Sequence, residues 1–182
     1  FVITEDGLRI TNVPDKKEFE LVIKNKNFPV KNTALDGLYV SGDILCTQNE
    51  PEGFRRITYS IDRPDNMMSI SVTLKGKKSE FPYMLANGNL IDQGEEGGFH
   101  WCKWEDPFPK PCYLFAIVAG ELEEVCDTYK TASGRDVDIK FYCDPGNASK
   151  CEFAIESLKK SMKWDEIRFG LEYDLDLYMV VA

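Results

Sequence analysis

The chain has 182 residues, 43% of them apolar, which is enough for a folded core in one domain and part of a second. Its formal net charge of −9 argues against nucleic acid or an anionic membrane surface as a partner. No apolar run approaches the roughly 20 residues that a membrane-spanning helix needs, so we expect no membrane segment.

Most of the chain shows short runs in which apolar and polar side chains alternate, a pattern typical of half-buried β-strands. Asn87 and Gly88 separate two of these runs and favour a tight β-hairpin between them. The pattern predicts an antiparallel sandwich or saddle-like sheet. The runs expected to be strands are 19–24, 57–61, 68–74, 81–85, 90–91 and 99–104.

The segment 106–111 contains three prolines, which lack the backbone donor of a central strand, so we expect it outside the centre of a sheet. It leads into the apolar run 112–119, which has the length of a buried strand and ends at Gly120. The only histidine, His100, lies among aromatic residues and is interpreted as a packed strand residue.

The character of the sequence changes after the acidic stretch 121–124. We therefore place a domain boundary near Leu122, which divides the chain into domains 1–122 and 123–182. Just beyond the boundary, 128–131 and 137–141 are predicted to form another hairpin.

One helix is predicted from near Ser149 to Trp164 or beyond. Ser149 and Glu152 have the spacing of a capping box, and Gly170 can end the helix. The same serine completes a glycosylation sequon at Asn147, for which helix capping is the simpler explanation. The apolar stripe that this helix would bury is formed by Ala154, Ile155, Leu158 and Met162.

The cysteines show no CxxC pair, and with a single histidine they do not support a structural zinc site. We interpret them as reduced, mostly buried thiols, which favours a cytoplasmic location over an oxidising one. The six are Cys46, Cys102, Cys112, Cys126, Cys143 and Cys151.

Both ends of the chain lie within apolar sequence, beginning at Phe1 and finishing in the run 177–182. Bare apolar strands are rare at natural chain ends, because their unpaired edges would be exposed. We therefore expect a piece of a longer protein, with any targeting signal outside it.

A cluster of polar residues interrupts the strand-like sequence at 47–52 and surrounds Pro51. It can be a loop whose polar groups only cap a turn. It can also be a ligand site in which the carboxylate of Glu50 receives an ammonium group and Gln48 is the neutral partner. The residues alone leave both interpretations open. The chain contains no HExxH, P-loop, GxSxG or GxGxxG motif, so it is not expected to be a self-sufficient enzyme.

Three long stretches resemble the zinc aminopeptidase N family, and most closely its bacterial branch. The first, TALDGLYVSGDILCTQNEPEGFRRITYSIDRPD (33–65), and the second, DPFPKPCYLFAIVAG (106–120), resemble the end of the N-terminal β domain of that family. The third, SLKKSMKWDEIRFGLEYDLDLYMVVA (157–182), resembles the opening of its thermolysin-like catalytic domain.

The resemblance implies a mainly β fold: an antiparallel saddle whose first strands are missing, then the β-rich, one-helix beginning of an α+β catalytic domain. In the family, a loop of the saddle sends a glutamine and a glutamate into the active site, where the glutamate helps hold the free α-amine of a peptide substrate. The order of the motif places these roles on Gln48 and Glu50.

The resemblance also implies that the catalytic parts lie beyond Ala182. These are the GAMEN motif, the HExxH helix, the third zinc ligand and the tyrosine that stabilises the transition state. Zinc is therefore expected in the full-length enzyme and none in this chain, which should be inactive without the missing remainder of its catalytic domain. The alternative is a non-catalytic β-rich binding module or an inactive relative. The sequence that follows in the parent gene would distinguish the two.

Overall fold

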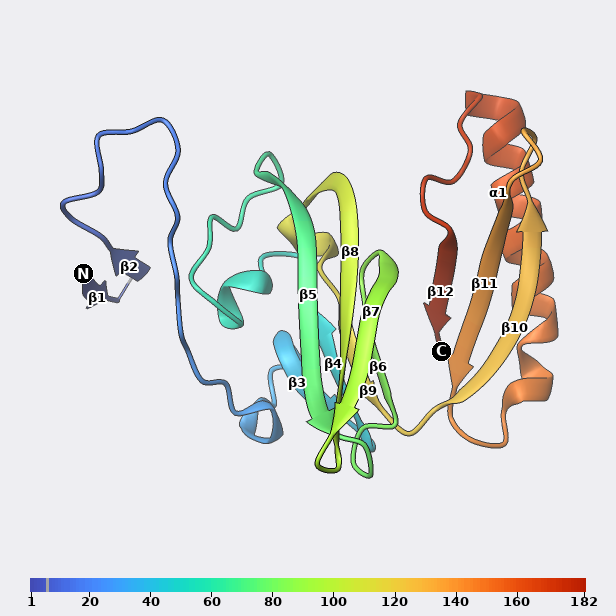
Figure 1. Cartoon of the computed structure of the whole chain (residues 1–182), viewed down its shortest axis with the longest axis horizontal. Helices are drawn as coiled ribbons and strands as arrows, with labels where there is room; N and C mark the ends of the chain where they lie inside the picture. The colour runs from blue at the N-terminus through green and yellow to red at the C-terminus, as the bar shows by residue number, and fades with distance from the viewer. Residues whose placement is uncertain (6) are drawn as a thin grey trace.

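A computed structural model describes residues 1–5 and 7–182 of the chain. Figure 1 shows two sheet-containing bodies side by side, with the N-terminal segment extended along one flank. The α-helix is α1 (Glu152–Phe169). The strands are β1 (Val2–Thr4), β2 (Gly7–Arg9), β3 (Gly37–Ser41), β4 (Ile44–Gln48), β5 (Met67–Lys77), β6 (Tyr83–Ala86), β7 (Asn89–Glu96), β8 (Phe99–Pro111), β9 (Ile117–Gly120), β10 (Glu123–Lys130), β11 (Asp136–Cys143) and β12 (Leu177–Val181).

The fold is mainly β, as predicted, and almost every strand pair is antiparallel. The larger body contains two sheets, ordered β3-β4-β9-β6 and β5-β8-β7. The smaller body contains the sheet β10-β11-β12, in which β10 and β11 form the predicted hairpin and β12 joins β11 in parallel. β1 and β2 form a separate small hairpin.

The last sheet is buried on both faces, which explains why β12 reads as a continuous apolar run. Leu177, Met179 and Val181 pack toward the core of the larger body, together with Met84 and Trp104. Tyr178 and Val180 point the other way, into a second core under α1. Figure 1 shows α1 covering the outer face of this sheet. The two bodies are therefore joined by a shared apolar layer.

Two of the predicted strands are absent from the structure. Residues 19–24 are irregular, and 57–61 form turns after the 3-10 helix η2 (Phe54–Arg56). Alternation was a misleading signal because a strand also needs a neighbour that completes its hydrogen bonds. Here a side chain supplies part of that pairing: the amide of Asn27 donates to the carbonyl oxygen of Ile57 at 3.0 Å.

The predicted hairpin at Asn87 and Gly88 is also wrong. β6 pairs with β9 and β7 pairs with β8, so the turn carries the chain from one sheet to the other. Gly88 has φ +96°, and a Cβ atom at this position would lie 2.1 Å from the carbonyl oxygen of Glu105. The glycine is needed for a close crossing of two backbones.

The proline-rich segment 106–111 belongs to β8, the middle strand of its sheet, which contradicts the simple expectation. The reason for that expectation, the missing N–H donor of proline, still applies to this part of β8. The pairing of β7 with β8 ends at Asn89 and Glu105, so the prolines have β5 on one side and no strand on the other. The apolar run that follows is divided between the 3-10 helix η3 (Cys112–Leu114) and β9.

The helix prediction is correct in place and wrong in its start. Ser149 lies in the 3-10 helix η4 (Ala148–Lys150), and α1 begins after Cys151 without a side-chain cap. Helix capping therefore does not account for the sequon. Gly170 does end the helix, in the left-handed conformation with φ +67°.

The other local predictions concern the histidine and the cysteines. His100 is a half-buried residue of β8 whose ring Nε2 donates to the carbonyl oxygen of Phe81 at 2.6 Å, as expected for a packed strand histidine. All six cysteines are free thiols, and four of them are buried: Cys102, Cys112, Cys143 and Cys151.

The turn between the sheets gives a direct test of packing. The change Gly88→Ala is expected to lower the free energy of unfolding by at least about 2 kcal/mol, because it adds a backbone clash to an unfavourable φ. Gly134→Ala is the matched control: its φ is +93° and no atom lies within 4 Å of the added Cβ. Urea unfolding of both variants measures the difference, and equal losses would contradict the close crossing.

Candidate functional site

The polar cluster singled out from the sequence is a loop that leaves the end of β4. The backbone ladder between β4 and β9 contains only the pairs Leu45–Ala119 and Cys46–Val118. One residue further on, the side chain of Thr47 replaces the missing pair: its Oγ1 accepts from the Ile117 N–H at 2.9 Å. The loop thus begins at a point fixed to the neighbouring strand.

The loop brings the two predicted site residues together, but in different roles. Gln48 and Glu50 are both exposed, and the side-chain amide of Gln48 donates to the carbonyl oxygen of Glu50 at 3.1 Å. Within residues 1–5 and 7–182, the carboxylate of Glu50 has no hydrogen-bond or ion-pair partner. The nearby Glu52, by contrast, pairs with Arg55 at 3.5 Å. The loop therefore presents one uncompensated carboxylate, which can accept a cationic group.

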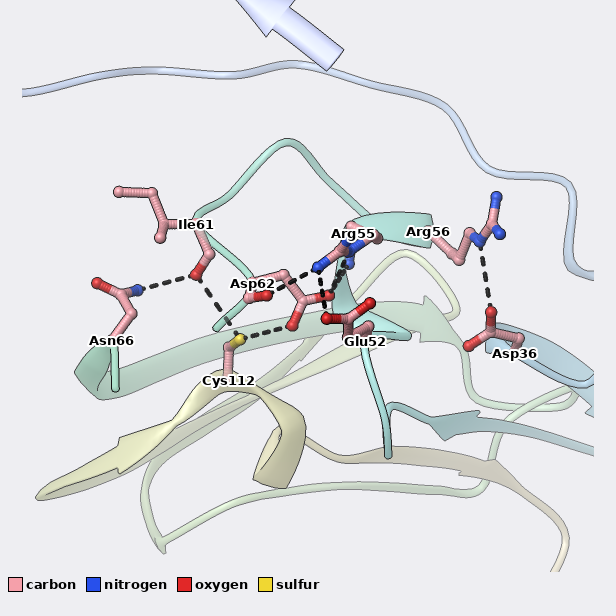
Figure 2. Close-up of polar contacts among 8 residues, drawn as sticks. All are labelled: Asp36, Glu52, Arg55, Arg56, Ile61, Asp62, Asn66 and Cys112. Carbon is pink, nitrogen blue, oxygen red and sulfur yellow. Dashed lines mark hydrogen bonds and ion pairs between the residues drawn. The ribbon is translucent and has the colours of Figure 1, made fainter. Parts of the chain in front are cut away.

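The far side of the loop is held by a buried carboxylate (Figure 2). Asp62 is only 6% exposed and accepts from the backbone N–H and the Nε of Arg55, at 3.0 and 3.1 Å. Its other oxygen accepts from the thiol of Cys112 at 3.0 Å. The guanidinium of Arg55 thus bridges Asp62 inside and Glu52 outside, and ties η2 to the loop.

These contacts shift the acidity of both buried groups. Burial opposes ionisation of Asp62, but the hydrogen bonds from Cys112 and Arg55 outweigh it and lower the pKa of the carboxyl group. Burial, and then the bond to the Asp62 carboxylate, raise the pKa of the Cys112 thiol to about 11. Asp62 is therefore the charged member of the pair at neutral pH, and Cys112 is a hydrogen-bond donor.

Sequence reasoning did not find the residues that shape the loop. Gly53 lies against the chain so closely that a Cβ would be 2.5 Å from both the Gln48 carbonyl oxygen and Asp36 Oδ1. Asn49 is 3% exposed, and its amide donates to the carbonyl oxygen of Phe115 at 2.6 Å. No local pattern marks these positions, because their partners are distant in the chain or belong to its backbone.

The donor set of the described residues does not suit a zinc ion. No group of three or more histidine, cysteine, aspartate or glutamate side chains in that set is close enough to hold a metal. In the same residues, no helix is long and apolar enough to cross a membrane.

Residues 9–114, more than half of the chain, match the family model of the Peptidase M1 N-terminal domain. The chain belongs to the M1 peptidase family. This confirms the resemblance drawn from the sequence motifs.

Curated members of the M1 family are similar along nearly all of this chain. Aminopeptidase N of Escherichia coli (strain K12) is 55% identical over 179 residues, which are 98% of the chain and 20% of the relative. Aminopeptidase N of Caulobacter vibrioides is 49% identical over 181 residues, or 99% and 21%. The chain spans about a fifth of the length of these relatives.

Solved M1 structures share the fold. The crystal structure of Legionella pneumophila aminopeptidase A in complex with aspartic acid superposes with a TM-score of 0.79 at 44% identity, covering 82% of this chain and 18% of that one. A variant of the M1 zinc metallopeptidase from Deinococcus radiodurans, bound to a Tyr-Ser-Ala substrate, gives 0.69 at 18% identity, covering 80% and 33%. The second likeness shows the fold alone.

The buried carboxylate predicts a stability effect with a defined pH dependence. Asp62→Asn is expected to cost about 2 kcal/mol at neutral pH, because the hydrogen bonds to Arg55 and Cys112 lose their charge. Folding lowers the pKa of Asp62 below its ordinary 3.8, so the contribution is complete above that pH and is lost as the pH falls toward the folded-state value.

Urea unfolding at pH 7 and pH 3 measures this effect. Asp65→Asn is the control, because Asp65 also pairs with an arginine, at 2.6 Å, but on the exposed surface. A loss for Asp62→Asn that is as large at pH 3 as at pH 7 would contradict the assignment.

Proposed function

We propose that this chain is part of an aminopeptidase that removes amino acids from the free N-terminus of peptides. In this proposal, residues 1–122 form the saddle domain and 123–182 begin the catalytic domain. Membership of the M1 family and the names of the similar relatives support the reaction class. The chain passes from β9 in one body to β10 in the other at 121–122, which supports the boundary.

The observation that carries the proposal is the carboxylate of Glu50, which has no partner among residues 1–5 and 7–182 and stands on a loop that is fixed at both ends. An ammonium group is best held by a carboxylate through charge-assisted hydrogen bonds, which are about twice as strong as neutral ones. We assign this role to Glu50. A carboxylate already paired with an arginine, such as Glu52, is a poorer acceptor because its charge is partly compensated.

Gln48 supports this site in two ways. Its side-chain amide donates to the carbonyl oxygen of Glu50, so it restrains the backbone that bears the carboxylate. It also borders the site with a neutral polar group, which can contact the first residue of the substrate. A site of this composition rejects a peptide with a blocked amine, because the carboxylate would be left buried and unpaired under the substrate.

Zinc, in this proposal, is a cofactor of the complete enzyme and is held by polypeptide beyond this chain. A neighbour with the same fold is named as a zinc metallopeptidase. When bound, zinc activates a water molecule for attack on the first peptide bond. The contribution of this chain is to bind and orient the substrate amine. Its partners are peptides with a free N-terminus and the remainder of the catalytic domain.

Two further parts of the proposal follow from the residues. The net charge of −9 still argues against nucleic acid as a partner. The free thiols favour a cytoplasmic location for the enzyme.

The role of Glu50 is tested in the parent enzyme, which extends this chain to the length of its relatives. Glu50→Gln is expected to raise KM for an aminoacyl anilide about ten- to a hundredfold and to lower kcat/KM, because the ammonium loses its charged partner. Glu52→Gln, two residues away, is the matched control and should leave KM within about twofold. Steady-state kinetics on both variants measures the difference.

An unchanged KM for Glu50→Gln would remove the assignment of the amine anchor. If the parent enzyme itself hydrolyses no aminoacyl anilide, the protein is instead an inactive relative that uses this loop for binding alone.

The assignment of zinc to polypeptide beyond residues 1–182 gives a separate prediction. The purified chain 1–182 is expected to retain no stoichiometric zinc after dialysis and to release no product, whereas the parent enzyme does both. Metal analysis by mass spectrometry, together with the anilide assay, measures these outcomes. Stoichiometric zinc on the chain alone would contradict the assignment of the metal to the missing part.

A further inference from the structure

Side chains attach the Glu50 loop to the segment 115–117, beyond the point where the backbone ladder stops. Thr47 bonds to Ile117 on one side of the loop. On the other side, the ring of Phe54 lies edge-on against Phe115 with centroids 5.1 Å apart. Between these two contacts lies Asn49, whose amide donates to the carbonyl oxygen of Phe115 at 2.6 Å.

Asn49 is an unusual residue for a buried position. It is 3% exposed, and its Oδ1 has no hydrogen-bond partner in the described part of the chain. The bond from its side chain to Phe115, together with the bond that its backbone carbonyl oxygen accepts from the Gly53 N–H at 3.0 Å, gives this part of the loop a defined orientation.

The direction of that bond determines where the neighbouring side chains point. Asn49 is directed inward and is buried, while Gln48 and Glu50 on either side are exposed. Without the bond to Phe115, the loop could rotate about this position. The carboxylate of Glu50 would then occupy a range of positions.

We propose that Asn49 is the positioning residue of the amine site: by holding the loop against Phe115, it fixes the direction in which the carboxylate of Glu50 meets the substrate ammonium. This inference rests on the proposed function of Glu50. Asn49 itself does not touch the substrate. Its effect reaches the substrate only through Glu50, and this makes the proposal distinguishable from a general structural role.

The test is a double-mutant cycle in the parent enzyme, with KM for an aminoacyl anilide as the readout. Asn49→Leu has nearly the same shape and removes the donor. It is expected to raise KM about three- to tenfold, with a smaller change in kcat. In the Glu50→Gln background, the same change should alter KM less than about twofold, because there is no charged carboxylate left to position.

Two further variants separate positioning from folding. Asn49→Ser keeps a shorter donor and should give an intermediate KM. Asn27→Leu removes an amide-to-carbonyl bond away from Asn49, to Ile57 at 3.0 Å, and should leave KM unchanged, while Tm reports its effect on folding.

The possible failures have different meanings. If Glu50→Gln raises KM while Asn49→Leu does not, or if Asn49→Leu raises KM by the same factor in both backgrounds, the positioning role is overturned and the amine anchor stands. If Glu50→Gln leaves KM unchanged, the proposed function fails and the inference fails with it.

Discussion

The candidate site depends on how one loop is fastened to a neighbouring strand after their backbone pairing has ended. β4 and β9 share only two residue pairs, and the hydrogen bonds of Thr47 and Asn49 and the ring of Phe54 continue the contact from there. Side chains can hold the loop to β9 without the extended backbone that strand pairing requires. The loop can therefore turn outward while its base stays fixed. In the proposed function, this fixed base reduces the entropy that the loop loses when a ligand binds.

Most described carboxylates around this loop are paired with an arginine, and Glu50 is the exception. The carboxylates of Glu52 and Asp62 are both bound by Arg55, and Asp36 pairs with Arg56 at 3.3 Å. Among the described residues, Glu50 has no such arginine partner. The net charge of −9 adds a general field that favours cationic groups, which agrees with the proposed role of Glu50.

The two bodies of the molecule are coupled both by apolar contact and by polar contact near the start of β12. The side chain of Asn89 donates to Asp176 at 3.0 Å and accepts from its backbone N–H at 3.1 Å. Arg135 bonds to the same aspartate at 3.1 Å from the β10–β11 turn. These bonds fix the segment that leads into β12 against the larger body.

Local sequence was sufficient for the features whose partners lie nearby: the β10–β11 hairpin, the helix ending at Gly170, the packed His100 and the alternating strands β5 and β8. It was also sufficient to bring attention to Gln48 and Glu50, because polar residues around a proline stand out between apolar strands. It failed where hydrogen bonding depends on a distant neighbour. The segment 57–61 alternates but has no strand beside it, and Gly88 crosses between sheets because the backbone of Glu105 passes there. Asn49 bonds to Phe115, 66 positions along the chain, and Asp62 accepts from Cys112, 50 positions away, as well as from the nearby Arg55. The two long-range contacts exist only once the chain has folded.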